Sequence, residues 1–471
     1  MSTAPQYGRL TPSLIDEFKA IIGADHLFSD HETISLYASD ETEDYSFPPD
    51  LVLKPGTTRE VSEILAVANR AHIPVTPRGG GTGLSGGALA VHGGICLSME
   101  RFNRILEIDT QNLIAIAEPG VVTQVLQEEV ERAGLFYPPD PASRGSSHLG
   151  GNLAECAGGP RAVKYGVTKD YVLGLEAVLP DGQVLSTGSR VLKNVSGYNL
   201  TQLIIGSEGT LAVITRIILR LVPLPRERKV MLVAFRSVDD ATAAVAAIFQ
   251  AGITPSALEF LERAAVRAAE ERQGKKFPNG EAEAQLFIEV DGMHEESLQR
   301  EVELIAGVVE RYNPLDVLLA EDRAKIESVW QLRRGIGEAV KSISPYKEED
   351  TVVPRTKLPE LVRGVKEICR RYDVESICYG HAGDGNLHVN ILKQDKSDES
   401  WFGRIDRAIE EILTLTVTLG GTISGEHGIG YSQRAYLPLA LSPVELDLMT
   451  RIKATVDPHH ILNPGKIFPD E

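Results

Sequence analysis

The sequence contains little cysteine, no long apolar run and no excess of positive charge. Its 471 residues include only four cysteines, without a CxxC pair or the spacing of a secreted disulfide scaffold. We therefore expect buried or incidental thiols in a reducing compartment. No stretch approaches the roughly 20 apolar residues of a membrane span, so none is expected. The cysteines are Cys96, Cys156, Cys369 and Cys378.

The net charge and the first residues of the chain limit the kind of partner and the location that we expect. A formal net charge of −18 argues against nucleic acid as a partner, although a local basic pocket for a small anion remains compatible with it. Residues 1–9 lack a charged segment followed by an apolar run, so no signal peptide is predicted. We expect a cytoplasmic protein, peripheral to a membrane only through a partner.

The order of local patterns predicts an α+β protein of several domains. A chain of 471 residues is too long for one hydrophobic core. A strand at 50–54, a capping box at Thr57–Glu60 that opens a helix, and a strand at 74–77 predict a parallel βαβ unit. Further on, Asp181-Gly182 predicts a hairpin, and strands are expected at 211–215 and 217–222, around Arg216.

A change in composition at 223–229, with two prolines and a run of charges, indicates a domain boundary. Beyond it, strands and helices alternate as far as Leu392, which suits a ferredoxin-like sandwich. No internal repeat is evident in the sequence.

A glycine-rich segment follows the second strand of the predicted βαβ unit. Residues 81–86 match GxGxxG, but no helix pattern follows them, so a Rossmann dinucleotide site is rejected. No Gly-Lys-Ser/Thr follows either, which excludes a P-loop. Glycines nevertheless let backbone amides approach an anion closely.

Two histidines flank the dipeptide Asp384-Gly385, a strong signal for a two-residue hairpin turn. With that turn, His381 would lie opposite His388, and Tyr379 opposite Asn390. Side chains paired in this way have Cβ atoms roughly 4.5–5.5 Å apart, so the two imidazoles are expected to share one divalent cation. Asn390 would face the same side as His388.

A second segment, Ser424–Gly430, offers a glutamate and a histidine side by side. Glu426 would supply an oxygen ligand to the cation and leave His427 free as a base. Neighbours on an ideal strand point to opposite faces, so the flanking glycines are expected to permit a turn that brings both to one site.

Five motifs in this order resemble the flavoproteins of the vanillyl-alcohol oxidase and p-cresol methylhydroxylase superfamily, and among them the FAD-linked D-2-hydroxyacid dehydrogenases. The resemblance extends from about Asp50 to Phe468. The motifs are Pro77–Gly83; Pro138–Pro141 with Gly150–Asn152; Ala157–Gly159 with Lys164–Gly166; Gly206–Thr210; and the two histidine segments.

The resemblance implies a bipartite FAD-binding domain with two α+β subdomains over residues 1–225. A substrate or cap domain of the ferredoxin-like type, 226–420, would be inserted and cover the flavin ring. Residues 421–471 would return to complete the FAD site. The residues implied to bind FAD are Arg78, Gly79, Gly80, Gly81, Thr82, Gly83, Pro141, Ser143, Gly150, Gly151, Asn152, Ala157, Gly158, Gly209, Ile214 and Asn463.

The activity implied is oxidation of a D-2-hydroxy acid to the 2-oxo acid, with hydride transfer to flavin N5. Zinc, iron or manganese held by His381, His388 and Glu426 would polarise the hydroxyl. His427 would accept its proton as the catalytic base, and Asn390 would lie in the catalytic site.

Arginines in the same region are candidates for the substrate carboxylate. Arg333 is favoured because its motif position matches a substrate arginine in the family, and a guanidinium offers a planar fork. Arg355 is a second candidate, and Arg334 remains an alternative to Arg333.

Two departures from the family pattern make the predictions about the flavin linkage and the substrate more specific. Thr82 stands near the position where members with covalent flavin have a histidine, so non-covalent FAD is predicted. D-2-Hydroxyglutarate dehydrogenases commonly carry a threonine four residues after the substrate arginine, where this chain has Gly337. A short acid such as D-lactate or glycolate is therefore favoured over D-2-hydroxyglutarate.

Two other classes remain as alternatives. The histidines and glutamate would also suit a zinc hydrolase, and a flavin protein without catalysis would serve as an electron relay. Relatives pass electrons to quinones, to electron-transfer flavoprotein or to an iron–sulfur partner subunit. A homodimer is one option for the assembly.

Overall fold

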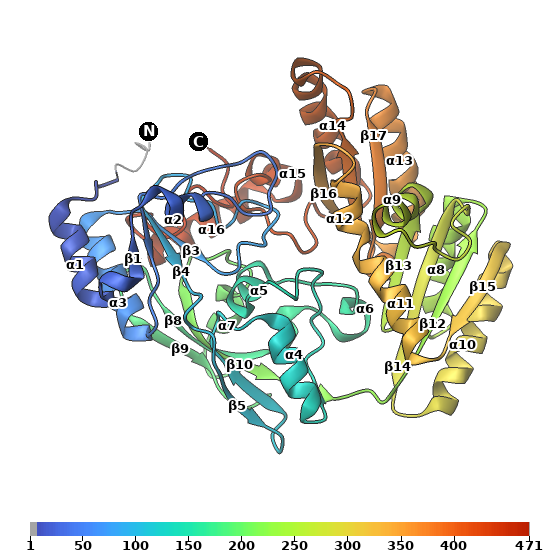
Figure 1. Cartoon of the computed structure of the whole chain (residues 1–471), viewed down its shortest axis with the longest axis horizontal. Helices are drawn as coiled ribbons and strands as arrows, with labels where there is room; N and C mark the ends of the chain where they lie inside the picture. Colours follow the sequence, from blue (N-terminus) through green and yellow to red (C-terminus); the bar gives the residue numbers. More distant parts are fainter. Residues whose placement is uncertain (1–6, 471) are drawn as a thin grey trace. The chain divides into compact units, whose positions relative to one another are not determined.

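The computed structural model describes residues 7–470, and most of its elements are labelled in Figure 1. It divides into two compact units. The first comprises Met1–Ala157, Val167–Leu224 and Glu426–Glu471, and the second comprises Gly158–Gly166 and Pro225–Gly425. The prediction of no signal peptide rests on residues 1–9, of which residues 1–6 lie outside the described part of the chain. No helix within 7–470 is both long enough and apolar enough to cross a membrane.

The first sheet of the first unit contains the predicted parallel βαβ unit. Helix α3 (Thr58–Ala71) connects β2 (Leu51–Leu53) to β3 (Val75–Arg78), and β4 (Ile95–Ser98) lies between them, parallel to both. Thr57 caps α3 by accepting a hydrogen bond from the amide of Glu60 at 3.2 Å. The apolar face of α3 is buried, as its spacing predicts.

The second sheet of this unit is antiparallel, and its order is β5-β6-β10-β8-β9. The predicted hairpin at Asp181-Gly182 joins β8 to β9 and is confirmed. The two strands expected around Arg216 are one strand, β10, which is bulged between Ile214 and Arg216. The strands are β5 (Ile105–Asp109), β6 (Ile114–Ala117), β8 (Val172–Val178), β9 (Val184–Gly188) and β10 (Val213–Arg220).

Shorter elements complete the first unit. The tail returns to the first sheet, where Val75 N–H donates to Ile461 O and Asn463 N–H donates to Val75 O, each at 2.7 Å. The remaining elements are α1 (Pro12–Ile22), β1 (Leu27–Phe28), α2 (His31–Leu36), α4 (Thr123–Arg132), β7 (Leu135–Phe136), α5 (Leu149–Glu155), α7 (Leu200–Ile204), β11 (Val222–Pro223), α15 (Leu437–Ala440) and α16 (Pro443–Val456).

The second unit is built on one seven-stranded sheet in which every pairing is antiparallel. Its order is β15-β12-β14-β13-β17-β18-β16. Along the sheet, its first four places are taken by the fourth, first, third and second strands of this unit in sequence, which is the ferredoxin-like order expected. The strands are β12 (Glu227–Phe235), β13 (Ala257–Glu262), β14 (Ala284–Gly292), β15 (Pro314–Ala320), β16 (Tyr346–Val352), β17 (Glu375–Gly380) and β18 (Asn386–Leu392).

The other three strands repeat the pattern of the first four in the order of their elements. Strand β16, helix α13 (Leu358–Arg371), the β17–β18 pair and helix α14 (Asp398–Thr418) follow one another in the same order. Thr422 forms an antiparallel bridge with Val352 of β16, where a fourth strand would lie. The repeat concerns topology, so sequence similarity does not reveal it.

Helices cover both faces of this sheet. Helices α9 (Arg263–Gln273), α11 (Arg323–Arg334) and α12 (Ile336–Lys341) pack on the face that presents Leu261, Phe287 and Tyr379. Helices α8 (Val238–Gln250) and α10 (Glu295–Val309) contact the strands from the other face, together with α13 and α14. The short helix α6 (Ala162–Tyr165) also belongs to this unit.

Candidate functional site

The glycine-rich segment lies between β3 and β4 and contains no helix, as predicted. Gly81 has φ +69°, and a Cβ there would lie 2.3 Å from Nη2 of Arg78. A Cβ on Gly80 would lie 2.5 Å from the carbonyl oxygen of Ser146. Glycine is therefore needed at position 80 for this loop to pack against the segment around Ser146, and at position 81 because of the left-handed backbone conformation.

The backbone of this loop fits an anion. The amides of Gly79 to Gly83 donate to no acceptor among residues 7–470. A Cβ on Gly83 or on Gly151 would meet nothing within 4 Å, so open space lies beside both. Consecutive free amides next to open space are what a pyrophosphate cradle requires. The residues present therefore fit the dinucleotide expected here.

The segment 141–152 lies against the loop and carries other predicted cofactor residues. A Cβ on Gly79 would lie 3.5 Å from Cβ of His148 and 3.6 Å from the amide nitrogen of Gly151. Asn152 Nδ2 donates to Thr123 Oγ1 at 2.6 Å, and Gly150 N–H donates to Pro119 O at 2.7 Å. The carbonyl oxygens of Pro141 and Ser143 accept turn hydrogen bonds within this segment.

Asn463 links the tail to the same region. Its Nδ2 donates to Gly87 O at 3.0 Å and to Glu208 O at 2.7 Å. A Cβ on Gly209 would lie 3.5 Å from Pro77 and 3.9 Å from Asn463 Nδ2. Of the other residues predicted to bind FAD, Ile214 is buried on β10. Ala157 is the last residue of the first segment of the first unit. Gly158 belongs to the second unit.

In the second unit, the predicted register of the histidine hairpin is wrong. Tyr379 pairs with His388 and Ile377 with Asn390, a shift of two residues. The connection is a 3-10 turn at Ala382–Asp384 followed by Gly385 at φ +79°, not a two-residue turn. A shift of two keeps each side chain on its predicted face. The rings of His381 and His388 therefore still meet, with centroids 5.3 Å apart.

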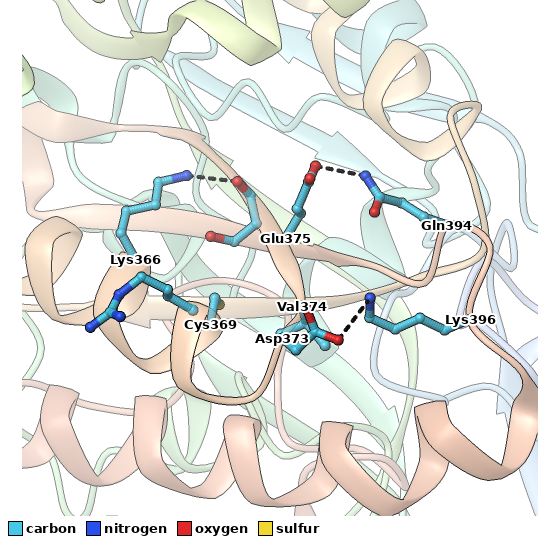
Figure 2. Close-up of a pocket in the computed structure, with 9 residues that line it drawn as sticks. Lys366, Cys369, Asp373, Val374, Glu375, Gln394 and Lys396 are labelled. Atoms are coloured by element: carbon cyan, nitrogen blue, oxygen red, sulfur yellow. Dashed lines mark hydrogen bonds and ion pairs between the residues drawn. The ribbon is translucent and has the colours of Figure 1, made fainter.

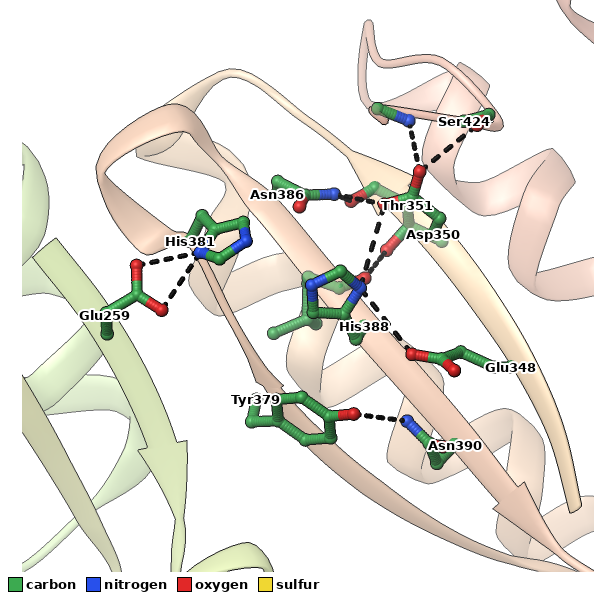
Figure 3. Close-up of polar contacts among 12 residues, drawn as sticks. Glu259, Glu348, Asp350, Thr351, Tyr379, His381, Asn386, His388, Asn390 and Ser424 are labelled. Atoms are coloured by element: carbon green, nitrogen blue, oxygen red, sulfur yellow. Dashed lines mark hydrogen bonds and ion pairs between the residues drawn. The ribbon is translucent and has the colours of Figure 1, made fainter. Parts of the chain in front are cut away.

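His381 is held by a carboxylate that the sequence analysis missed. Its Nδ1 lies 2.8 and 2.9 Å from the two carboxylate oxygens of Glu259, a fully buried residue of β13 (Figure 3). Burial raises the pKa of Glu259, but His381 and Arg333 outweigh it and hold that pKa below its ordinary value. The carboxylate is therefore ionised, and it fixes the imidazole with Nε2 directed away.

His388 lies between two further acids on β16. Its Nδ1 is 3.8 Å from Glu348 and 3.8 Å from Asp350. Asp350 accepts hydrogen bonds from Asn386 Nδ2 at 2.6 Å and from the amide of Gly425 at 2.7 Å (Figure 3). The chain immediately before Glu426 and His427 is thus fixed on the strand that faces His388. Both of those residues belong to the first unit.

Asn390 and Tyr379 extend the polar row along the sheet. Asn390 is fully buried, and its Nδ2 donates to the Tyr379 hydroxyl at 3.5 Å. Burial, with the charge of Glu348, raises the pKa of Tyr379 well above its ordinary value, so the phenol stays neutral. The row from Glu259 through His381 and His388 to Asn390 lies on the face covered by α9, α11 and α12.

The predicted arginines have structural partners. Arg333 is buried and donates through Nε, at 2.8 Å, and Nη2 to Glu259. Arg355 donates through Nε to Gly383 O, and its guanidinium lies 4.1 Å from the ring centroid of Phe249. Arg334 pairs with Glu327 at 3.1 Å. The carboxylate role of Arg333 and Arg355 stays a prediction.

A cavity of about 400 Å³ lies elsewhere in the second unit, between the end of α13 and the start of β17 (Figure 2). Its polar walls pair with one another, as Lys396 does with Asp373 at 3.7 Å and Gln394 with Glu375 at 2.6 Å. None of the predicted site residues lines it.

Comparison with known proteins identifies the chain. Residues 49–188 match the FAD binding domain family, and residues 224–467 match the C-terminal domain of FAD linked oxidases. The chain is 38% identical to glycolate oxidase subunit GlcD of Bacillus subtilis, over 98% of this chain and 97% of that one. This chain belongs to the FAD-linked oxidases. It is an FAD-linked oxidoreductase, and family membership sets aside the zinc hydrolase and the electron relay.

Other relatives of this FAD-linked oxidase cover nearly the whole chain. D-lactate dehydrogenase of Anaerostipes hadrus is 36% identical, over 98% of both chains. D-2-hydroxyglutarate dehydrogenase of Stutzerimonas stutzeri is 33% identical, over 97% of this chain and 99% of that one.

Solved structures confirm the fold expected from the sequence. Substrate-bound p-cresol methylhydroxylase is similar with a TM-score of 0.82 and 17% identity, over 97% of this chain and 96% of that one. 4-Ethylphenol oxidase from Gulosibacter chungangensis is similar with a TM-score of 0.78 and 20% identity, over 99% of both chains.

Proposed function

We propose that this FAD-linked oxidase converts a small D-2-hydroxy acid, D-lactate or glycolate, into the 2-oxo acid. The observation that carries the proposal is the pair of buried imidazoles, 5.3 Å apart and each beside carboxylates, in a chain whose glycine loop fits FAD. When bound, FAD accepts the hydride from the substrate carbon. The electrons then pass to a quinone, electron-transfer flavoprotein or an iron–sulfur partner subunit.

His381, His388 and Glu426 would hold a divalent metal ion, either zinc, iron or manganese. With Nδ1 bonded to Glu259, His381 has Nε2 for the ion, which is the usual arrangement of a ligating histidine and its carboxylate. Glu348 and Asp350 add negative charge beside His388, which favours a cation there. Such an ion would act as a Lewis acid on the substrate hydroxyl. Three protein ligands leave room for substrate.

His427 would accept the hydroxyl proton, since an imidazole titrates near neutral pH. Asn390, buried in the same row as His388, would orient the substrate. Arg333 is the favoured partner for the substrate carboxylate, although two of its nitrogens already donate to Glu259. Arg355 is the second candidate, and its Nε holds the turn between the two histidines.

The surroundings of this row support a short monocarboxylate. Gly337 offers no hydroxyl, and a Cβ there would lie 3.4 Å from the hydroxyl of Tyr379. Glu348 and Asp350 would repel a second substrate carboxylate near His388. D-2-Hydroxyglutarate is the alternative substrate.

The remaining parts of the proposal concern the holoprotein. With Thr82 in place of a histidine, FAD is bound without a covalent link. Denaturation in acid should then leave the yellow colour in the supernatant, and colour in the pellet would contradict this. The protein is expected in the cytoplasm, at a membrane only through its acceptor, and a homodimer is one option.

The activity is tested by anaerobic mixing of the purified holoprotein with glycolate, D-lactate and D-2-hydroxyglutarate. We expect the short acids to bleach the flavin with the highest kcat/KM, and D-2-hydroxyglutarate as the best substrate would overturn the assignment. His427→Ala should retain FAD and lose bleaching, because the base is gone. Metal analysis of the same sample tests the ligand set.

A further inference from the structure

Glu208 lies in the loop between α7 and β10 and is buried, with 6% of its surface exposed. Its Oε1 accepts a hydrogen bond from the amide of Ile429 at 2.7 Å. Its Oε2 accepts one from the amide of Gly430 at 2.6 Å. One carboxylate therefore holds two consecutive amides, and the first of them lies two residues beyond His427.

The carboxylate is itself held in place. Glu208 has φ +52°, an unusual conformation for a residue with a side chain. Its amide donates to Ala154 O at 2.9 Å, and its carbonyl oxygen accepts from Asn463 Nδ2 at 2.7 Å. Strained backbone of this kind persists only where the surroundings fix it. Glu208 is therefore a rigid anchor.

The segment after His427 contains two glycines, Gly428 and Gly430, that let it pass close to Glu208 and its neighbours. Gly428 has φ +81°, and a Cβ there would lie 2.0 Å from Glu155 Oε2 and 3.1 Å from Glu208 Oε1. Gly430 has φ +51°, and its Cβ would lie 2.1 Å from Ser85 O. Two glycines give this segment much conformational freedom. The hydrogen bonds to Glu208 fix its backbone at Ile429 and Gly430, and Tyr431 N–H, which donates to Ser85 O at 2.7 Å, fixes it further on.

We propose that Glu208 is a positioning residue for His427, which rests on the proposed role of His427 as the base. By fixing the amides of Ile429 and Gly430, the carboxylate sets the backbone from which the imidazole projects. Proton abstraction needs the base within hydrogen-bond reach of the hydroxyl, and a displacement of about 1 Å can lower the rate ~10²-fold. Glu208 therefore acts on kcat through His427 and touches no reacting atom.

The test compares Glu208→Gln and Glu208→Asp with Glu118→Gln in the holoprotein. A glutamine at 208 keeps one acceptor oxygen but turns a donor NH₂ toward the second amide, so one hydrogen bond is lost. Glu118 is the matched control, because it is a buried carboxylate of the same unit that accepts the amide of Arg104 at 2.9 Å.

We expect Glu208→Gln to retain FAD and to lower kcat by roughly 10²-fold with KM nearly unchanged, the pattern of a lost transition-state interaction. Glu208→Asp should recover part of kcat, and Glu118→Gln should leave kcat unchanged. Hydrogen exchange of the peptide spanning residues 426–431 should be slow in the wild type and faster in Glu208→Gln only.

Three results would overturn the proposal: unchanged kcat in Glu208→Gln, an equal loss of kcat in Glu118→Gln, or a loss of activity that only follows FAD loss. If the variants at position 208 do not fold, hydrogen exchange of the wild type tests the proposal by itself. Slow exchange of the amides of Ile429 and Gly430 would support the role of Glu208, and rapid exchange would contradict it. Failure of the proposed function is seen separately, as a wild type that no 2-hydroxy acid bleaches.

Discussion

Nδ1 of His381 lies 2.8 Å from Oε1 of Glu259, a carboxylate of the neighbouring strand with no exposed surface. The same carboxylate receives Nε and Nη2 of Arg333. It therefore orients a proposed metal ligand and neutralises a buried cation at the same time.

Glu259→Gln should weaken metal binding by about 10–100-fold, as loss of a carboxylate behind a ligating histidine typically does. Metal content after dialysis against a series of chelator concentrations measures the change. Glu262→Gln on the same strand is the control, because Glu262 binds Lys366 and the amide of Cys378 instead. Equal metal retention in the two variants would show that Glu259 has no such role. Unfolding should also become easier for Glu259→Gln, since Arg333 keeps a buried charge without a counter-ion.

Gly83→Ala should lower FAD affinity by at least about tenfold, or 1.4 kcal/mol. The new methyl meets nothing within 4 Å in the protein itself, so it affects only a ligand that occupies the open space beside it. The apoprotein should keep its Tm, and titration of the apoprotein with FAD by fluorescence gives the affinity. Gly307→Ala is the control, because a Cβ there also meets nothing within 4 Å but lies on α10. Unchanged FAD affinity in Gly83→Ala would place the cofactor elsewhere.

Lys453→Met should destabilise the tail by about 3–5 kcal/mol, because it leaves the fully buried Asp457 without its cation. Lys453 Nζ also donates to Thr210 O at 2.7 Å and to Leu462 O at 2.8 Å. Urea unfolding measures the loss, and FAD content should fall with it, since Asn463 follows Leu462.

Arg451→Met on the same helix is the matched control for Lys453→Met. Its pair with Asp447 at 3.0 Å is exposed, and such pairs contribute about 0–1 kcal/mol. Similar losses in the two variants would contradict the importance of burial at Lys453.

The two Asp-Gly dipeptides show where local sequence predicts structure and where it does not. At Asp181-Gly182 the turn connects β8 and β9 with the predicted hairpin. At Asp384-Gly385 it does not, because tertiary contacts shape the turn. A Cβ on Gly385 would lie 1.9 Å from Val353 O, and Arg355 binds Gly383 O. The histidines were still placed on the correct face, since the register differs by two.

The roles of Glu259 and Glu208 could not be predicted from the sequence for a different reason, although Glu208 lies within the motif Gly206–Thr210. Glu259 meets its partner His381 across 122 positions of sequence, and Glu208 meets Ile429 across 221. No local periodicity connects residues so far apart. A charged residue within an apolar strand, as in Ala257–Glu262, was the available signal for Glu259, because a buried charge requires a partner.

The two topological repeats meet where β13 pairs with β17, and this junction has a mechanical consequence. Strands β13 and β17 are joined by only two residue pairs, Phe260 with Gly380 and Leu261 with Tyr379, whereas β12 and β14 are joined by nine. The hydrogen bond that Nδ1 of His381 donates to Glu259 crosses this short junction between β13 and β17. Sliding of one repeat along the other would therefore move the imidazole relative to its carboxylate, and it would also disturb the apolar cluster that Leu261 and Tyr379 share. The hydrogen bond that His381 donates to Glu259 therefore resists relative movement of the two halves of the sheet.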